Sequence, residues 1–388
     1  MAQVVIIGGG TAGLPAAYEL AELARPGERI TVVADRDHFR PGASAPWITA
    51  LDNTGFDLAQ NLRRRGIGFT AAGARRLHPE RNQLELGDGN VLDYDFIVIA
   101  AGPRPAFEEI QGLGPRGYTH SLCHGDHLAG CVRDWNRFVL DPGPVVVGAV
   151  QGATCFGPAY ESAFLMEREL RTRGLRGRVA MTFVTAEPYV GHLGVDGIGD
   201  SRARLEAALR ERDIAWIAGA RIERVERGVM HVTEVGSART HLLRFRYSMM
   251  MPPFRGIEAV AGIEGLADAR GFILIDEFLR NPKYPNVYAA GVTVASAGPD
   301  AARIAAEARK TAYVIQSMVS AVARNIRDGL DGKAPAASAE WNPVHLADLG
   351  ASGLAFVADP AAATRPAHGV AAGDWVQMSR CSACDVAH

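Results

Sequence analysis

The sequence is poor in cysteine, has no excess of charge of either sign, and contains no long apolar run. Five cysteines among 388 residues are too few and too irregularly spaced for a secreted disulfide scaffold. The 41 basic and 43 acidic residues create no field that would hold nucleic acid. No apolar window reaches the length of a membrane span, and Met1 leads into an apolar strand without a signal-peptide pattern. We therefore expect a cytoplasmic protein, or one peripheral on the inner membrane, with no nucleic-acid partner.

A glycine-rich turn lies near the start of the chain. The motif VVIIGGGTAGLPAAY, which starts at Val4, predicts a strand, a tight turn and a helix. Gly8 permits the turn, Gly10 lets the backbone approach a pyrophosphate, and Gly13 lets helix and strand pack closely. A second predicted strand, residues 29–34, ends at Asp35, where a carboxylate can bind ribose hydroxyls. Together these features predict a dinucleotide site.

Two later segments repeat one pattern, a buried strand followed by a turn of small residues. Residues 94–102 end at Gly102, and residues 286–291 end at Gly291. Two strand ends of this kind around one Rossmann unit favour FAD as the dinucleotide, with Gly102 and Gly291 among the residues that bind it. The length of the chain exceeds what one core usually supports, which also predicts more than one domain.

These patterns predict an α/β fold with two Rossmann-like dinucleotide-binding domains. The FAD domain is expected to be split in sequence around the second domain, and a small C-terminal cap is expected to follow. The predicted boundaries are 1–110 and 265–330 for the FAD domain, 111–264 for the second domain, and 331–388 for the cap and tail.

An apolar run at residues 145–150 predicts the first strand of the second domain. The turn after it lacks a full GxGxxG motif and continues into a lone thiol, Cys155, so we expect NAD(P)H to bind poorly. Residues 178–185 and 215–217 predict strands, and residues 201–211 predict a helix between them, which preserves a βαβ layer. A thiol where a phosphate turn is expected suggests sulfur redox chemistry.

Five segments carry a resemblance to one flavoprotein family. They are FRPGASAPW at 39–47, TCFGPAYE at 154–161, EPYVGHLG at 187–194, YSMMMP at 247–252 and LADLG at 346–350. The chain resembles the sulfide:quinone oxidoreductases, and their relatives the flavocytochrome c sulfide dehydrogenases, along nearly its whole length to about residue 378. The resemblance implies that FAD oxidises a sulfur substrate through cysteines, on the face opposite a quinone site.

The resemblance assigns roles to five residues near the sulfur. Cys155 matches the cysteine that lies against the flavin, where it would carry a persulfide and form a covalent adduct. Glu161 matches an acid that handles protons. Cys123, His127 and His192 match a cysteine and two histidines of the family, and histidine can relay protons near physiological pH. Other interpretations of these residues remain open. Cys155 is then an inert thiol, Glu161 lies on a helix surface, and the histidines have structural roles.

The resemblance also implies contacts to FAD from Pro46, Ala74 and Lys310. The composition favours a helix from about Pro299, and a helix from Lys310 onward would direct its positive end at the pyrimidine edge of the flavin. The Lys310 ammonium would add charge at the same place. A surface lysine is the alternative.

Three features depart from the family pattern. One is the segment 291–304, where the family commonly has a proline-rich loop before the lysine that corresponds to Lys310. Where the family has its second essential cysteine, this sequence has His345, which cannot form a disulfide or polysulfide bridge. The last residues carry Cys381, Cys384 and His388 in place of amphipathic helices that frame quinone. Two cysteines and one histidine do not close a zinc site, so we predict no metal. Three interpretations of the tail cysteines remain open. They form a dithiol pair, they belong to an incidental tail, or one of them replaces the missing partner of Cys155.

The leading prediction is an FAD-dependent oxidoreductase that oxidises sulfide or a small persulfide through Cys155 and passes the electrons to quinone. A sulfide dehydrogenase that reduces a cytochrome or other soluble acceptor remains open. So does a catalytically impaired flavin- or sulfur-binding homologue, in which His345 reflects lost activity. Reduction of the flavin by NADH would instead favour the NADH dehydrogenase branch. We leave a homo-oligomer open.

Overall fold

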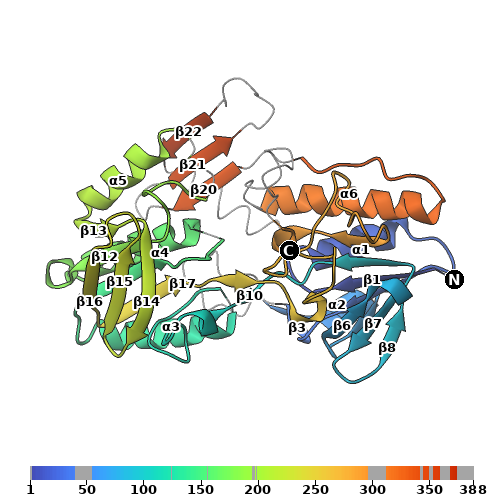
Figure 1. Cartoon of the computed structure of the whole chain (residues 1–388), viewed down its shortest axis with the longest axis horizontal. Helices are drawn as coiled ribbons and strands as arrows, with labels where there is room; N and C mark the ends of the chain where they lie inside the picture. Colours follow the sequence, from blue (N-terminus) through green and yellow to red (C-terminus); the bar gives the residue numbers. More distant parts are fainter. Residues whose placement is uncertain are drawn as a thin grey trace. The chain divides into compact units, whose positions relative to one another are not determined.

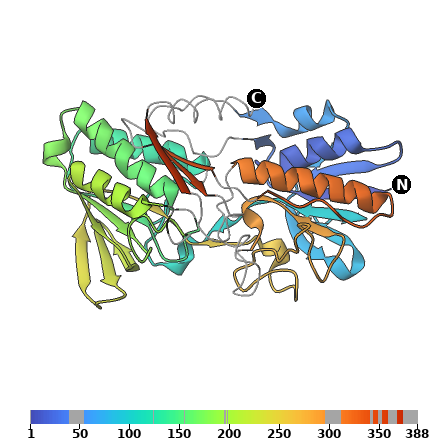
Figure 2. The same cartoon turned by 90° about the horizontal axis from the view of Figure 1, so that it is seen from above.

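The computed structural model describes two compact units, which we treat separately (Figures 1 and 2). The described residues are 2–39, 55–123, 125–154, 156–194, 197, 199–295 and 312–340, with the backbone of 344–348, 353–358 and 368–373. The first unit consists of Met1–Pro41, Asn53–Arg104 and Arg255–Pro343, and the second consists of Gly42–Asp52, Pro105–Phe254 and Val344–His388. Each unit has its own hydrophobic core.

A five-stranded parallel sheet forms the centre of the first unit. Its order is β19-β9-β1-β2-β5. Strands β1 and β9 are almost continuous apolar runs, as expected where a parallel sheet is covered on both faces. The strands are β1 (Gln3–Ile7), β2 (Arg29–Val33), β5 (Gly68–Thr70), β9 (Phe96–Ile99) and β19 (Val287–Ala289).

Three helices and two small antiparallel groups complete the described part of the first unit. Helices α1 (Gly13–Leu23) and α6 (Ala312–Leu330) pack against each other, although nearly 300 residues separate them in sequence (Figure 1). Helix α2 (Leu58–Arg63) is capped by Asp57, whose Oδ1 accepts a hydrogen bond from Gln60 N–H at 2.6 Å. The antiparallel strands are the pair β3 (His38–Phe39) and β4 (Phe56–Asp57), and the meander β6 (Ala74–His78), β7 (Gln83–Leu86) and β8 (Val91–Asp93).

The second unit is built on a four-stranded parallel sheet with the order β13-β12-β11-β17. Helix α5 connects β12 to β13, which confirms the predicted βαβ layer. The strands are β11 (Val145–Ala149), β12 (Met181–Thr185), β13 (Ile214–Ile217) and β17 (Tyr247–Met251), and the helices are α3 (Gly125–Phe138), α4 (Gly157–Thr172) and α5 (Ser201–Glu211).

Two antiparallel three-stranded sheets belong to the second unit. One consists of β14, β15 and β16, and the other, formed by β20, β21 and β22, lies with β20 against α4 (Figure 1). The short strands β10 (Arg104–Pro105) and β18 (Phe254–Arg255) lie where the chain passes from one unit to the other. The remaining bounds are β14 (Ala220–Glu226), β15 (Val229–Glu234), β16 (Thr240–Arg244), β20 (Val344–Asp348), β21 (Gly353–Ala358) and β22 (His368–Gly373).

The structure confirms the predicted α/β fold with parallel sheets and moves the start of one predicted strand by three residues. The strand predicted over residues 178–185 begins at Met181. A 3-10 turn precedes it, because the Arg176 guanidinium donates hydrogen bonds to the carbonyl oxygens of Val179, Arg212 and Asp213 at 2.6 to 2.7 Å. The helix predicted from about Pro299 lies outside the described residues.

Two features are absent from the described residues. Within those residues, no helix is both long and apolar enough to span a bilayer. The same part of the chain contains no group of three or more His, Cys, Asp or Glu side chains placed to hold a metal ion.

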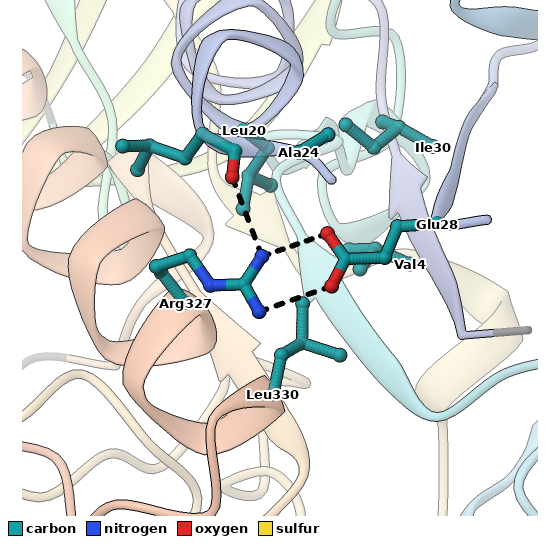
Figure 3. Close-up of a pocket in the computed structure, with 8 residues that line it drawn as sticks. Val4, Leu20, Ala24, Glu28, Ile30, Arg327 and Leu330 are labelled. Carbon is teal, nitrogen blue, oxygen red and sulfur yellow. Dashed lines mark hydrogen bonds and ion pairs between the residues drawn. The ribbon is translucent and has the colours of Figure 1, made fainter. Parts of the chain in front are cut away.

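An ion pair fixes the end of α6 beside β2 in the first unit (Figure 3). The Arg327 guanidinium donates two hydrogen bonds to the Glu28 carboxylate, at 2.7 and 3.0 Å, and one to Asp331 at 2.9 Å. A small cavity of about 10 Å³ lies beside the pair and is lined mainly by apolar side chains, among them Leu20 and Leu330. The side chains of Arg327 and Glu28 are only 13% and 15% exposed, so water screens this pair weakly.

We expect Arg327→Met to lower the free energy of unfolding by about 1 kcal/mol at neutral pH, because Glu28 loses two charged donors. The hydrogen bonds from Arg327 lower the pKa of Glu28 below its ordinary value of 4.5. The contribution of the pair is therefore complete above that value and is lost as the pH falls through the lowered folded pKa. Urea unfolding of both proteins at neutral and acidic pH measures this. Arg25→Met is the control, because it removes a more exposed partner of Asp331. It should lower the free energy of unfolding by less than Arg327→Met does.

Candidate functional site

The glycine-rich turn joins β1 to α1 in the first unit. Gly8 has a φ of +119°, and a Cβ there would lie 2.5 Å from the carbonyl oxygen of Ala100. A Cβ on Gly13 would lie 1.9 Å from the carbonyl oxygen of Gly8. At Gly10, by contrast, no described atom lies within 4 Å of the Cβ position. The turn is therefore tightly packed at Gly8 and Gly13 and open at Gly10.

The turns after β9 and β19 lie beside this glycine turn. β9 pairs with both β1 and β19, so Gly102 and Gly291 follow neighbouring parallel strands. Gly291 has a φ of +82°, and a Cβ there would lie 2.8 Å from the Cβ of Ala12, at the start of α1. Gly102 has a φ of +70° and approaches the side chain of Val292. Both predicted glycines thus lie at the carboxyl edge of the sheet.

Asp35 and Ala74 lie at the end of the next strand, β2. The Asp35 side chain is 83% exposed, so its carboxylate is available to a ligand. The Gly73 N–H donates to the carbonyl oxygen of Ala34 at 2.8 Å, which places Ala74 and the start of β6 next to this strand end. The structure therefore brings the described nucleotide-binding candidates to one edge of one sheet.

A dinucleotide fits this edge. The open side of Gly10 leaves room for a pyrophosphate, the N–H groups of the first turn of α1 favour its negative charge, and the Asp35 carboxylate can accept hydrogen bonds from ribose hydroxyls. The site lies between β1 and β9, where the strand order changes direction and open parallel sheets bind ligands. Two further predicted FAD contacts, Pro46 and Lys310, lie outside the described residues.

The second unit carries the predicted sulfur-site residues. β11 ends at Ala149, and α4 begins at Gly157, two residues after Cys155 in sequence. Cys155 itself lies outside the described residues. Residues 159–164 of α4 are all buried, and Glu161 among them is only 7% exposed. The helix-surface alternative for Glu161 is therefore wrong.

His192 lies in the turn that follows β12, the strand next to β11. Its Nδ1 accepts a hydrogen bond from Gly194 N–H at 3.1 Å, and its ring meets that of Tyr189 edge-on at 5.2 Å between centroids. A Cβ on Gly194 would lie 3.4 Å from the ring of Phe156, the residue that precedes α4. The His192 turn and the start of α4 are thus in contact.

Cys123 and His127 lie on either side of the start of α3. The Cys123 Sγ lies 4.0 Å from the Sδ of Met251, the last residue of β17. The His127 ring meets Phe107 edge-on at 5.6 Å between centroids and lines an open groove of about 820 Å³. Cys131, on the same helix, is a structural thiol, because burial raises its pKa to about 11.

Glu187 and Tyr160 are not among the residues predicted from the sequence, yet the structure joins both to the His192 turn. The Tyr160 hydroxyl donates a hydrogen bond to Glu187 Oε2 at 2.7 Å, and both side chains are about 1% exposed. The only signal in the sequence is that each residue belongs to a segment shared with the family, 154–161 or 187–194.

Comparison with known proteins identifies the family. Residues 2–309 match the family described as pyridine nucleotide-disulphide oxidoreductase. The chain is 34% identical over 368 residues to the sulfide-quinone reductase of Aquifex aeolicus, which covers 92% of this chain and 84% of that one. The chain belongs to the sulfide:quinone oxidoreductases.

Two further comparisons agree with this membership. The X-ray structure of the sulfide:quinone oxidoreductase from Aquifex aeolicus matches with a TM-score of 0.90 and 32% identity, over 98% of this chain and 89% of that one. The mitochondrial sulfide:quinone oxidoreductase of Mus musculus is 23% identical over 74% of this chain and 65% of its own. The resemblance found in the sequence is therefore confirmed, and this sulfide:quinone oxidoreductase is an FAD-dependent oxidoreductase.

The residue that departs from the family pattern, His345, lies in β20 and pairs with Phe356 of β21. Only the backbone is described there. Cys381 and Cys384 lie outside the described residues, so a role for either as the partner of Cys155 stays a prediction.

Proposed function

We propose that this protein oxidises sulfide, or a small persulfide, at Cys155 and passes two electrons through FAD to a quinone. The observation that carries the proposal is the thiol between β11 and α4, where a dinucleotide-binding fold would form a phosphate turn. The positive end of α4 favours a thiolate at this place in the sequence, and the thiolate is the reactive form of cysteine.

The same turn supports sulfide rather than NAD(P)H as the electron donor. The Gln151 side chain exchanges two hydrogen bonds with the backbone of Ile222 on β14, at 2.8 and 3.0 Å. The turn after β11 is thus fixed by contacts within the protein, and it lacks the glycines that let a backbone approach a pyrophosphate.

The first unit would hold FAD at the carboxyl edge of its sheet. Gly10 leaves the backbone open to the pyrophosphate, Asp35 binds a ribose, and Gly291 lets the turn after β19 approach α1. Ala74 and Gly102 border the same edge, and Pro46 and Lys310 complete the proposed set. When bound, FAD supplies two-electron chemistry between the sulfur and the quinone.

The proposed chemistry balances with one redox-active cysteine. Sulfide sulfur would join Cys155 as a persulfide with the loss of two electrons, which bound FAD would carry to the quinone, and a second sulfide would then remove that sulfur as HSS⁻ and regenerate the Cys155 thiolate. Two HS⁻, one quinone and one proton thus give HSS⁻ and one quinol. The second sulfide replaces a second cysteine, because His345 has no sulfur.

Protons move through the side chains near Cys155 in this proposal. Oxidation of two HS⁻ to HSS⁻ releases one proton, and we assign its acceptance and relay to Glu161, buried in α4, and to His192, in the turn that contacts the start of α4. Cys123 and His127 are proposed as auxiliary groups on the α3 side. Because quinones partition into the bilayer, we propose that the protein meets its acceptor as a peripheral membrane protein.

Steady-state turnover tests the proposed function. Purified protein with FAD bound is mixed with sulfide and decylubiquinone, and in parallel with sulfide and ferricytochrome c or with NADH and decylubiquinone. We expect rapid quinone reduction with sulfide alone. Faster reduction of cytochrome c would assign the protein to the sulfide dehydrogenases, and no turnover with any acceptor would identify an impaired homologue.

A further inference from the structure

One buried carboxylate fixes the turn that carries His192. Glu187 follows β12 and is 1% exposed. Its Oε1 accepts a hydrogen bond from the backbone N–H of Leu193 at 2.5 Å, and its Oε2 accepts one from the Thr185 hydroxyl at 2.7 Å. The carboxylate therefore connects the end of β12 to the residue directly after His192.

The same carboxylate is linked to α4 through Tyr160. The Tyr160 hydroxyl donates to the carboxylate at 2.7 Å and accepts a hydrogen bond from Gly191 N–H at 2.9 Å. Its ring stacks on Phe183 of β12, with 4.4 Å between centroids. Because Tyr160 lies between Cys155 and Glu161 in the sequence, the helix that follows the proposed sulfur site is bonded to both sides of the His192 turn.

The network stabilises a turn with an unfavourable backbone. Leu193 has a φ of +60°, which costs a non-glycine residue about 1 kcal/mol or more. The Ser201 hydroxyl donates to the carbonyl oxygen of Gly191 at 2.7 Å on the other side of the turn. In this conformation Gly194 N–H donates to the Nδ1 of His192, so the neutral imidazole carries its proton on Nε2.

We propose that Glu187 and Tyr160 are positioning residues for His192. They hold the turn so that Nδ1 of His192 accepts a backbone hydrogen bond and Nε2 carries the exchangeable proton. The role of His192 in proton transfer rests on the proposed function, whereas the orientation of its ring does not. A buried carboxylate is costly unless all its hydrogen bonds are made, and this one accepts from the backbone, a threonine and a tyrosine.

Two substitutions test the proposal, with a control on the same helix. Tyr160→Phe removes the hydroxyl and keeps the ring stacked on Phe183, and Glu187→Gln places an NH₂ donor among groups that donate hydrogen bonds to the carboxylate. Glu167→Gln is the control, because Glu167 is 3% exposed and pairs with Arg171 and Arg176 instead. We expect the rate of flavin reduction by sulfide to fall roughly 10-fold in Tyr160→Phe and 10- to 100-fold in Glu187→Gln, and to stay within about twofold in Glu167→Gln.

Three readouts separate positioning from stability. FAD content and the rate at which decylubiquinone reoxidises dithionite-reduced enzyme should be unchanged in all three variants. The pH profile of flavin reduction by sulfide should lose one limb in His192→Asn, and the same limb should be lost in Glu187→Gln. Equal losses of rate in Glu167→Gln, or a loss explained by missing FAD, would overturn the proposal.

The tautomer of His192 gives a measurement independent of activity. Long-range ¹H–¹⁵N spectra of histidine-labelled holoenzyme, with His192→Asn for assignment, should show the Nε2–H form in the wild type and a mixture in Tyr160→Phe and Glu187→Gln. If sulfide does not reduce the wild-type flavin, the proposed function fails and these spectra still decide the positioning role. An unchanged His192 signal in both variants would overturn it.

Discussion

Replacement of Cys155 by serine is expected to slow the reduction of the flavin by sulfide by about three orders of magnitude or more, while FAD stays bound. A serine hydroxyl cannot carry a persulfide, and its pKa is too high for it to act as the nucleophile that a thiolate provides. Stopped-flow measurement of the flavin band under anaerobic conditions gives the rate directly.

The matched control for this prediction is Cys131→Ala. Cys131 is buried in the core of the second unit, and burial raises the pKa of its thiol to about 11, so it should take no part in the reaction. We expect the control to keep the wild-type rate. Sulfide-dependent reduction at an unchanged rate in Cys155→Ser would remove the proposed mechanism and direct attention to Cys123, Cys381 and Cys384.

Gly10→Val is expected to give a folded protein without FAD. No described atom lies within 4 Å of the Cβ position at Gly10, so the side chain fits the protein but projects where the pyrophosphate needs to approach. We expect FAD affinity to fall by about two orders of magnitude or more, which corresponds to roughly 3 kcal/mol. The ratio of flavin to protein absorbance after purification, with circular dichroism to verify folding, measures this.

Two other glycines make this prediction specific. Gly13→Ala should destabilise the first unit itself, because its Cβ would lie 1.9 Å from the carbonyl oxygen of Gly8. Gly236→Val, which also enters open space but lies between β15 and β16 in the second unit, should retain FAD. A Gly10→Val protein that purifies with one FAD per chain would show that the dinucleotide does not approach this turn.

The sequence predicted the parallel sheets well because their signals are local. β1, β2 and β11 are apolar runs followed by glycine or acidic turns, and α5 was predicted with its observed bounds of Ser201 and Glu211. The antiparallel sheets are not predicted by the sequence pattern. In the sheet of β20 to β22, for example, β22 reads HGVAAG, with no strong alternation of apolar and polar residues, so only its pairing with β21 defines it.

The part of the site that sequence reasoning missed depends on long-range contacts. Tyr160 and Glu187 are 27 residues apart, and their hydrogen bond exists only because α4 and the end of β12 pack together. A charged side chain on a helix is usually exposed, so the sequence pattern does not predict that Glu161 is buried, as it is here. Such residues follow from the packing of elements and not from the pattern within any one element.

Anaerobic titration of the purified holoenzyme with sulfide tests the central claim most directly. We predict that sulfide alone bleaches the visible flavin band, that decylubiquinone then restores it, and that NADH in a parallel cuvette leaves it unchanged. A band that sulfide does not bleach would contradict the account and mean that the change to His345 has abolished or redirected the chemistry. Bleaching by NADH would also contradict it and place the protein among the NADH dehydrogenases.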